Sequence, residues 1–197
     1  MSNQVIQALT KRRTQYALGK NVSISNAEIE SIIKEAVRQT PSSFNSQSSR
    51  AVILFGDASK QFWDLTREVL RGLVPAEAFA ATDGKMTAFA AGVGTVLFFE
   101  DQDTVQALNE KYPYDFNLFS EHSAGMTQLA VWTALAEANV GASLQHYNPV
   151  VDEQVRATWN IPASWKLRAQ MPFGSNEAAF PEKTFIDDAN RFKTFGA

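Results

Sequence analysis

Residues 25–55 read SNAEIESIIKEAVRQTPSSFNSQSSRAVILF, which joins a helical pattern, a polar loop and an apolar run. Ser25 and Glu28 have the spacing of a capping box, in which the two side chains satisfy free N–H groups at the start of a helix. Apolar residues then recur at helical spacing, which predicts a helix over residues 26–39 that ends before the following proline. The run Ala51-Val-Ile-Leu-Phe55 predicts a buried strand.

The same two patterns continue through the rest of the chain. Helical spacing predicts further helices over residues 2–11, 59–72, 75–91, 102–111, 120–139 and 150–158. Short apolar runs predict further strands at residues 95–99, 142–145 and 167–171. Helices interleaved with about four strands favour an α+β or α/β layered fold. Because no repeat or linker divides the chain, we expect a single domain over residues 1–197, with an extended tail after Gly174.

Composition excludes several classes of protein. The chain has 197 residues, no cysteine and a net charge of −3. Without cysteine there can be no disulfide, iron–sulfur cluster or cysteine nucleophile, and the acidic balance argues against a nucleic-acid partner. No apolar stretch reaches the roughly 18 residues of a membrane span, and the N-terminus lacks the apolar segment of a signal peptide. We therefore expect a cytoplasmic protein without a membrane partner.

The motifs of common enzyme classes are missing. There is no nucleophile elbow and no Walker A loop. Gly92 and Gly94 could open a dinucleotide-binding fingerprint, but Leu97 stands in place of the third glycine. His122 and His146 have no metal-ligand spacing, so neither a metal site nor a catalytic residue is predicted. An enzyme with this sequence would take its reactive atom from a bound cofactor.

Four clusters could hold an anionic, aromatic cofactor, because they supply cations, amides and aromatic rings. The cationic clusters are Arg12-Arg13-Thr14 and the C-terminal set Lys183, Arg191 and Lys193. The amide and aromatic clusters contain Asn45 and Gln47, and Gln145, His146 and Tyr147. Guanidinium groups bind phosphate, and side-chain amides can face a polar ring edge. Each cluster alone is more typical of an ordinary helix end, turn, solvated tail or structural histidine.

Taken in this order, the clusters resemble the nitroreductase superfamily, and most of all its short branch of fatty-acid-repression-mutant-like proteins. Arg12-Arg13-Thr14 resembles the Arg-Arg/Ser phosphate motif that opens the family's sequences. Pro41-Ser-Ser-Phe-Asn-Ser-Gln47 resembles its Pro-Ser-Ser-x-Asn-x-Gln loop, which lies along the flavin. Three further segments resemble signatures of the branch: residues 141–149, 170–174 and 190–195. Five motifs in the right order cover nearly the whole chain.

The resemblance implies an α+β fold of three layers, with a mostly antiparallel sheet flanked by helices and a C-terminal segment exchanged in a homodimer. It also implies one FMN at each of two sites on the subunit interface. The phosphate or ribityl end would contact Arg12, Arg13, Thr14, Lys183 and Arg191. The ring would contact Asn45, Gln47, Gln145, His146 and Tyr147. Pro181-Glu182-Lys183 keeps only one cation of the family's usual pair, so the choice between Lys183, Arg191 and Lys193 stays open.

The implied activity is a ping-pong oxidoreduction. NAD(P)H would reduce tightly bound FMN, which would then reduce a small planar acceptor such as a nitroaromatic or a quinone. The aromatic segment at residues 112–119 could roof the acceptor slot, or could equally pack in the core or in a dimer interface. Two other hypotheses remain: an FMN- or lipid-binding regulatory protein with little turnover, and a structural protein that binds no flavin.

Overall fold

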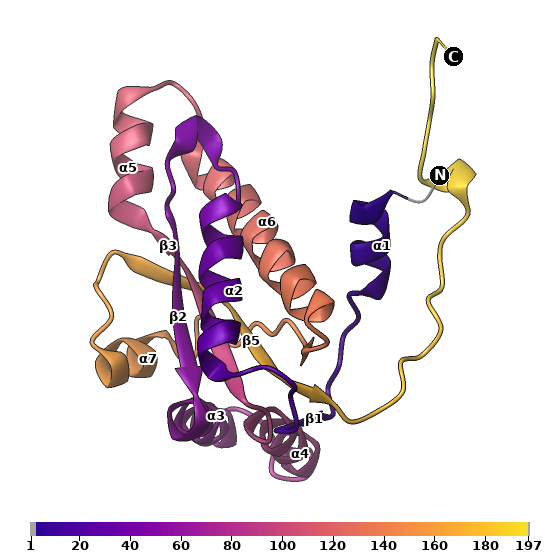
Figure 1. Ribbon diagram of the computed structural model, residues 1–197. Coiled ribbons are helices and arrows are strands. Elements are labelled where there is room, and N and C mark those ends of the chain that lie inside the picture. Colours follow the sequence, from indigo (N-terminus) through magenta and orange to yellow (C-terminus); the bar gives the residue numbers. More distant parts are fainter. Residues whose placement is uncertain (1–2, 197) are drawn as a thin grey trace.

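The computed structural model describes residues 3–196, and in that range seven α-helices surround a sheet of five strands (Figure 1). The helix expected from residue 2 and the domain expected over residues 1–197 thus extend slightly outside the described residues. Within them, no helix has both the length and the apolar character needed to cross a membrane.

The sheet has the strand order β1-β5-β3-β2, and β4 pairs with β5. The strands are β1 (Leu18–Gly19), β2 (Ser49–Phe55), β3 (Gly94–Asp101), β4 (Gly141–Ala142) and β5 (Trp165–Asn176). All pairings between these strands are antiparallel, which decides for the α+β class and confirms the predicted sheet type. The apolar runs predicted β2, β3 and β5 but underestimated their lengths, because strand pairing continues into polar residues. The predicted strand at residues 142–145 is mostly loop, with one isolated bridge at Gln145.

Two layers of helices cover the sheet. The helices are α1 (Gln4–Lys11), α2 (Asn26–Gln39), α3 (Gly56–Arg71), α4 (Phe79–Ala90), α5 (Gln102–Lys111), α6 (Phe116–Glu137) and α7 (Asp152–Trp159). Val96 and Phe98 of β3 pack with α2 and α6 on one face. Leu97 and Phe99 pack with α3, α4 and α7 on the other, as the period-two alternation of a strand requires. The predicted three layers are therefore confirmed (Figure 1).

Local signals placed some helix boundaries correctly and missed others. The capping box of Ser25 and Glu28 is formed, and α2 has the predicted bounds. In contrast, α6 begins at Phe116, four residues before its predicted start, because the Asp115 side chain accepts a hydrogen bond from the N–H of Leu118. Half of the predicted aromatic loop is therefore helical.

The two ends of the chain run together outside the sheet. Figure 1 shows α1 and the tail after β5 beside each other, away from α3, α4 and α7. Between residues 177 and 196 the tail has no helix or strand apart from a short 3₁₀ turn at Asp188–Asn190. Gln15 Nε2 donates to the carbonyl of Ala178 at 2.7 Å, so the start of the tail is held by the segment that follows α1. The expected extended tail is present.

Candidate functional site

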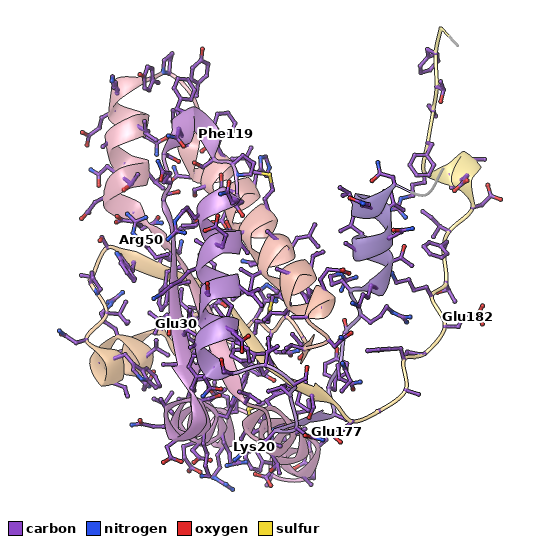
Figure 2. The ribbon with its side chains drawn as sticks, viewed as in Figure 1. Lys20, Glu30, Arg50, Phe119, Glu177 and Glu182 are labelled. Atoms are coloured by element: carbon purple, nitrogen blue, oxygen red, sulfur yellow. The ribbon has the colours of Figure 1, made fainter. Side chains whose placement is uncertain are left out.

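Three cations gather where the tail crosses the end of α1. Lys183 Nζ donates to the carbonyls of Leu9 and Thr10 at 3.4 and 3.2 Å, and Arg13 donates to the carbonyl of Pro181. We call Arg12, Arg13 and Lys183 the basic cluster. Figure 2 labels Glu177 and Glu182 on the part of the tail that leads to it.

The basic cluster is electrostatically uncompensated. Burial, and then the positive charge of Arg13, lowers the pKa of Arg12. Burial, followed by Arg12 and Arg13, lowers the pKa of Lys183. Within residues 3–196, none of the three forms an ion pair with a carboxylate. A bound anion would relieve this repulsion and accept charge-assisted hydrogen bonds, so the residues present fit a phosphate.

The first and fourth predicted clusters are neighbours in space. Thr14 forms a parallel bridge with Ala142, and the N–H of Gln15 donates to the carbonyl of Ala142 at 2.9 Å. The segment that contains Gln145, His146 and Tyr147 follows directly. A site that binds both a phosphate and a ring could therefore draw on two parts of the chain that are distant in sequence.

A buried glutamine positions that segment. Gln170 on β5 exchanges backbone hydrogen bonds with Gln145, and its side-chain oxygen accepts from the N–H of Tyr147 at 2.7 Å. The ring of Tyr147 lies edge-on to Trp63 in the core, 5.8 Å between centroids, and burial raises the pKa of its hydroxyl. His146 is exposed. The sequence signal for Gln170 was a polar residue inside an apolar strand, and its positioning role was not predicted.

The loop that contains Asn45 and Gln47 has an unusual backbone. Phe44, Asn45 and Gln47 have φ angles of 55°, 51° and 48°, in the left-handed region that non-glycine residues seldom occupy. Such strain costs on the order of 1–3 kcal/mol per residue and clusters at functional sites. The N–H of Gln47 donates to Ser42 Oγ at 2.8 Å. Within the described chain, the side-chain amides of Asn45 and Gln47 make no hydrogen bond and are free for a ligand.

The aromatic segment packs against the same loop. The Phe44 ring lies 4.8 Å from Tyr112 and 5.3 Å from Phe116, centroid to centroid. Phe116 is buried, whereas Phe44 and Tyr114 are exposed. The segment thus contributes both to the core and to an open aromatic surface beside Asn45.

Two of the predicted groups remain apart from the basic cluster in this chain. Arg191 and Lys193 are exposed beyond the 3₁₀ turn of the tail, and Arg191 lies over the ring of Phe192. The loop with Asn45 and Gln47 follows the end of α2 that is distant from β1, whereas Arg12 lies between α1 and β1 (Figure 1). No hydrogen bond or ion pair of the described residues joins this loop to the basic cluster.

The fold and these clusters define a class of protein. The sequence model of the nitroreductase family matches residues 9–175, and the chain therefore belongs to that family. This membership supports an oxidoreductase activity.

Individual relatives agree with this assignment. HBN1 of Saccharomyces cerevisiae is 35% identical over 186 residues, 92% of each chain. The nitroreductase CinD of Lactococcus lactis, solved in complex with chloramphenicol, is 46% identical with a TM-score of 0.89, over 97% of this chain and 99% of that one. CinD was also solved with 4-nitrophenol. A Desulfitobacterium hafniense nitroreductase with bound FMN is 15% identical with a TM-score of 0.74, over 99% of this chain and 100% of that one, and shares the fold.

Proposed function

We propose that the protein is an FMN-dependent oxidoreductase that uses NAD(P)H to reduce small planar acceptors such as nitroaromatics and quinones. The observation that carries this proposal is the basic cluster, in which Arg12, Arg13 and Lys183 meet beside Thr14 and form no ion pair with a carboxylate of residues 3–196. The complexes of CinD with chloramphenicol and with 4-nitrophenol, both nitroaromatic compounds, support this class of acceptor.

The chain's own residues would bind and orient the cofactor. Arg12, Arg13 and Lys183 would hold its phosphate, and the hydroxyl of Thr14 would add a hydrogen bond. Bound FMN would supply the redox chemistry, since it can accept a hydride from NAD(P)H and pass it to the acceptor. Because the cofactor would carry the reacting atoms, the reaction would not require a catalytic side chain, and none is assigned.

We further propose that a homodimer completes each site. Asn45 and Gln47 are separated from the basic cluster of their own chain, so these amides would face the ring that the partner's cluster holds. An apolar groove of about 600 Å³ between α1, α2 and α6 is lined by Val5, Leu9, Met126 and Leu129, among others. A second copy seated there would bury these side chains, as expected for a stable subunit interface. The tail, with exposed Phe185 and Phe195, would cross to that copy.

The aromatic surface beside Asn45 would then roof the acceptor slot. Phe44 and Tyr114 expose their rings next to a loop proposed to contact the flavin. Flat apolar molecules pack well against such rings. Arg191 and Lys193 remain candidates for the phosphate of the partner's site, since the tail carries them away from their own basic cluster.

The visible spectrum of the purified protein tests this function. We expect a flavin spectrum that bleaches with NADH or NADPH under anaerobic conditions and recovers on addition of 4-nitrophenol or a quinone. A flavin spectrum that neither nucleotide bleaches would favour the regulatory FMN-binding protein instead. Protein that takes up no FMN on incubation would overturn the proposal.

A further inference from the structure

Glu100 is a buried carboxylate with no role in the site proposed above. It is the penultimate residue of β3 and is 1% exposed. Burying a carboxylate is costly unless it is hydrogen-bonded or paired. Among the described residues no cation lies within ion-pair distance of Glu100, and Arg168 and Arg50 attract its charge from further away. Its closest polar contacts are hydrogen bonds.

Both carboxylate oxygens of Glu100 accept hydrogen bonds from consecutive serines. Ser48 Oγ donates to Oε2 at 2.5 Å, and Ser49 Oγ donates to Oε1. Ser49 Oγ also accepts from Thr127 Oγ1 of α6 at 3.3 Å. Ser48 and Ser49 directly follow Gln47, so the carboxylate holds the end of the loop that contains Asn45 and Gln47.

The next residue of β3 acts on the same loop through an arginine. Asp101 Oδ2 accepts from Arg50 Nη2 at 2.7 Å, and Arg50 Nη1 donates to the carbonyl of Gln47 at 2.5 Å. Figure 2 labels Arg50 on β2 near the base of this loop. The N–H of Asp101 also donates to the carbonyl of Ser48 at 2.9 Å. Residues 47–49 are therefore held by the carboxylate of Glu100, by the backbone of Asp101 and, through Arg50, by the carboxylate of Asp101.

Strand pairing alone does not need these carboxylates. The β2–β3 ladder runs through Ser49 and Glu100 by backbone contacts. One of the two hydroxyls that Glu100 binds belongs to Ser49, which the ladder already holds. The other belongs to Ser48, which lies between the ladder and Gln47 with its strained φ of 48°. Through Ser48 the carboxylate therefore extends the restraint of the ladder to the loop. Such a restraint is useful where a side chain must be presented in a costly conformation.

We infer that Glu100 is a positioning residue that sets the Asn45–Gln47 loop in the geometry required to contact the flavin. It acts through Ser48 and Ser49, and Asp101 reinforces it through Arg50. The inference rests on the proposed function, because it takes the flavin to be the ligand of the Gln47 amide. Glu100 itself touches neither the cofactor nor the acceptor.

The variants Glu100→Gln and Ser49→Ala test this inference, with Glu68→Gln as the matched control. Glu68 is an exposed carboxylate on α3 that forms an ion pair with Arg71 at 3.3 Å. Apoprotein is titrated with FMN, and the saturated holoproteins are compared by visible absorbance and by flavin reduction potential. At saturation, only folded protein with bound FMN contributes to the flavin signal. If Glu100 only stabilised the fold, the spectrum and the reduction potential of bound FMN would be unchanged, whereas a displaced loop would alter both.

We expect Glu100→Gln and Ser49→Ala each to weaken FMN binding by about 10-fold, the usual effect of losing a hydrogen bond to a charged group. Both variants should also shift the flavin absorbance band and the reduction potential in the same direction. The double variant should lose less FMN affinity than the product of the two single losses, because both substitutions remove the same interaction. The control should match the wild type. If Glu100→Gln does not fold, Ser49→Ala carries the test.

Two outcomes separate this inference from the proposed function. Variants that bind FMN with wild-type affinity, spectrum and potential would overturn the role of Glu100 and leave the proposed function intact. Wild-type protein that takes up no FMN would overturn both.

Discussion

The guanidinium carbon of Arg12 lies 4.2 Å from the centre of the Trp132 ring. This cation–π contact joins the C-terminal cap of α1 to the C-terminal half of α6, and it restrains the first arginine of the basic cluster. The Trp132 Nε1 atom is buried and has no hydrogen-bond partner among the described residues. The indole thus packs against the core on one side and carries the Arg12 guanidinium over its ring.

Replacement of Arg12 by Met should weaken FMN binding by about 10- to 100-fold, because a charge-assisted contact to the phosphate is lost. Riboflavin, which lacks the phosphate, should bind the variant and the wild type alike. Trp132→Ala should give a smaller loss in the same direction. Titration of apoprotein by flavin fluorescence measures both ligands, and Lys34→Met, an exposed cation on α2, is the control. An equal loss for riboflavin would show that Arg12 does not bind the phosphate.

Lys183→Met should remove a pH dependence of FMN binding. Burial, Arg12 and Arg13 lower the pKa of Lys183 below its usual 10.5. Wild-type affinity should therefore be full while Lys183 is protonated and should fall as the pH rises through this lowered pKa. The variant should bind more weakly at neutral pH and lack this fall. FMN titrations across the alkaline range measure it, and parallel curves for the two proteins would contradict the assignment.

Removal of residues 185–197 should convert the proposed dimer into a monomer. Phe185 and Phe195 are 76% and 88% exposed, so the tail makes little use of its own chain for apolar burial. Burial of such side chains in a partner contributes roughly 1.5–3 kcal/mol each. Light scattering after size-exclusion chromatography measures the mass, with full-length protein alongside. The truncation keeps Lys183 of the basic cluster. A truncated protein that still has the mass of a dimer would argue against an exchanged tail.

Glu100 should make the stability of the protein depend on pH in mild acid. Burial raises the pKa of Glu100 above its usual 4.5. Because the folded state holds this proton more tightly, its contribution to stability is full below the unfolded pKa and is lost as the pH rises through the folded pKa. Glu100→Gln cannot titrate, so the wild type should lose stability relative to it over this window. Urea unfolding at several pH values measures the difference, and a constant difference would contradict the shift.

Gly174→Ala should destabilise the fold by about 1–3 kcal/mol, the usual cost of overpacking. A Cβ at this position would collide with the carbonyl oxygen of Gly19 and lie 3.0 Å from the Cα of Gly92, both backbone atoms that cannot yield easily. Gly84→Ala on α4 is the control, because a Cβ there meets nothing within 4 Å. It should stabilise the helix by roughly 0.5–1 kcal/mol. Urea unfolding midpoints measure both effects, and a shift of the same sign and size for the two variants would contradict the packing argument.

Local chemistry explains what could be predicted from the sequence. The bounds of α2 follow from a capping box and a proline, and both act over a few residues. The buried strands follow from apolar runs. The motif order indicated the nitroreductase family, and the match over residues 9–175 confirms it. The same short-range reasoning failed at α6, where a single Asp115 cap extended the helix into an aromatic stretch.

Only the tertiary structure decided which charged and polar groups meet. Lys183 reaches the carbonyls of Leu9 and Thr10 across more than 170 residues of chain, and these contacts distinguish it from Arg191 and Lys193 of the tail. Glu100 lies next to the end of an apolar strand, and nothing in the sequence indicated that it holds Ser48 and Ser49. Composition and periodicity report the tendencies of neighbouring residues. The partner of a side chain that is distant in sequence depends instead on how strands and helices pack. Packing alone brings such side chains together in the interior, where the low dielectric constant strengthens their interaction.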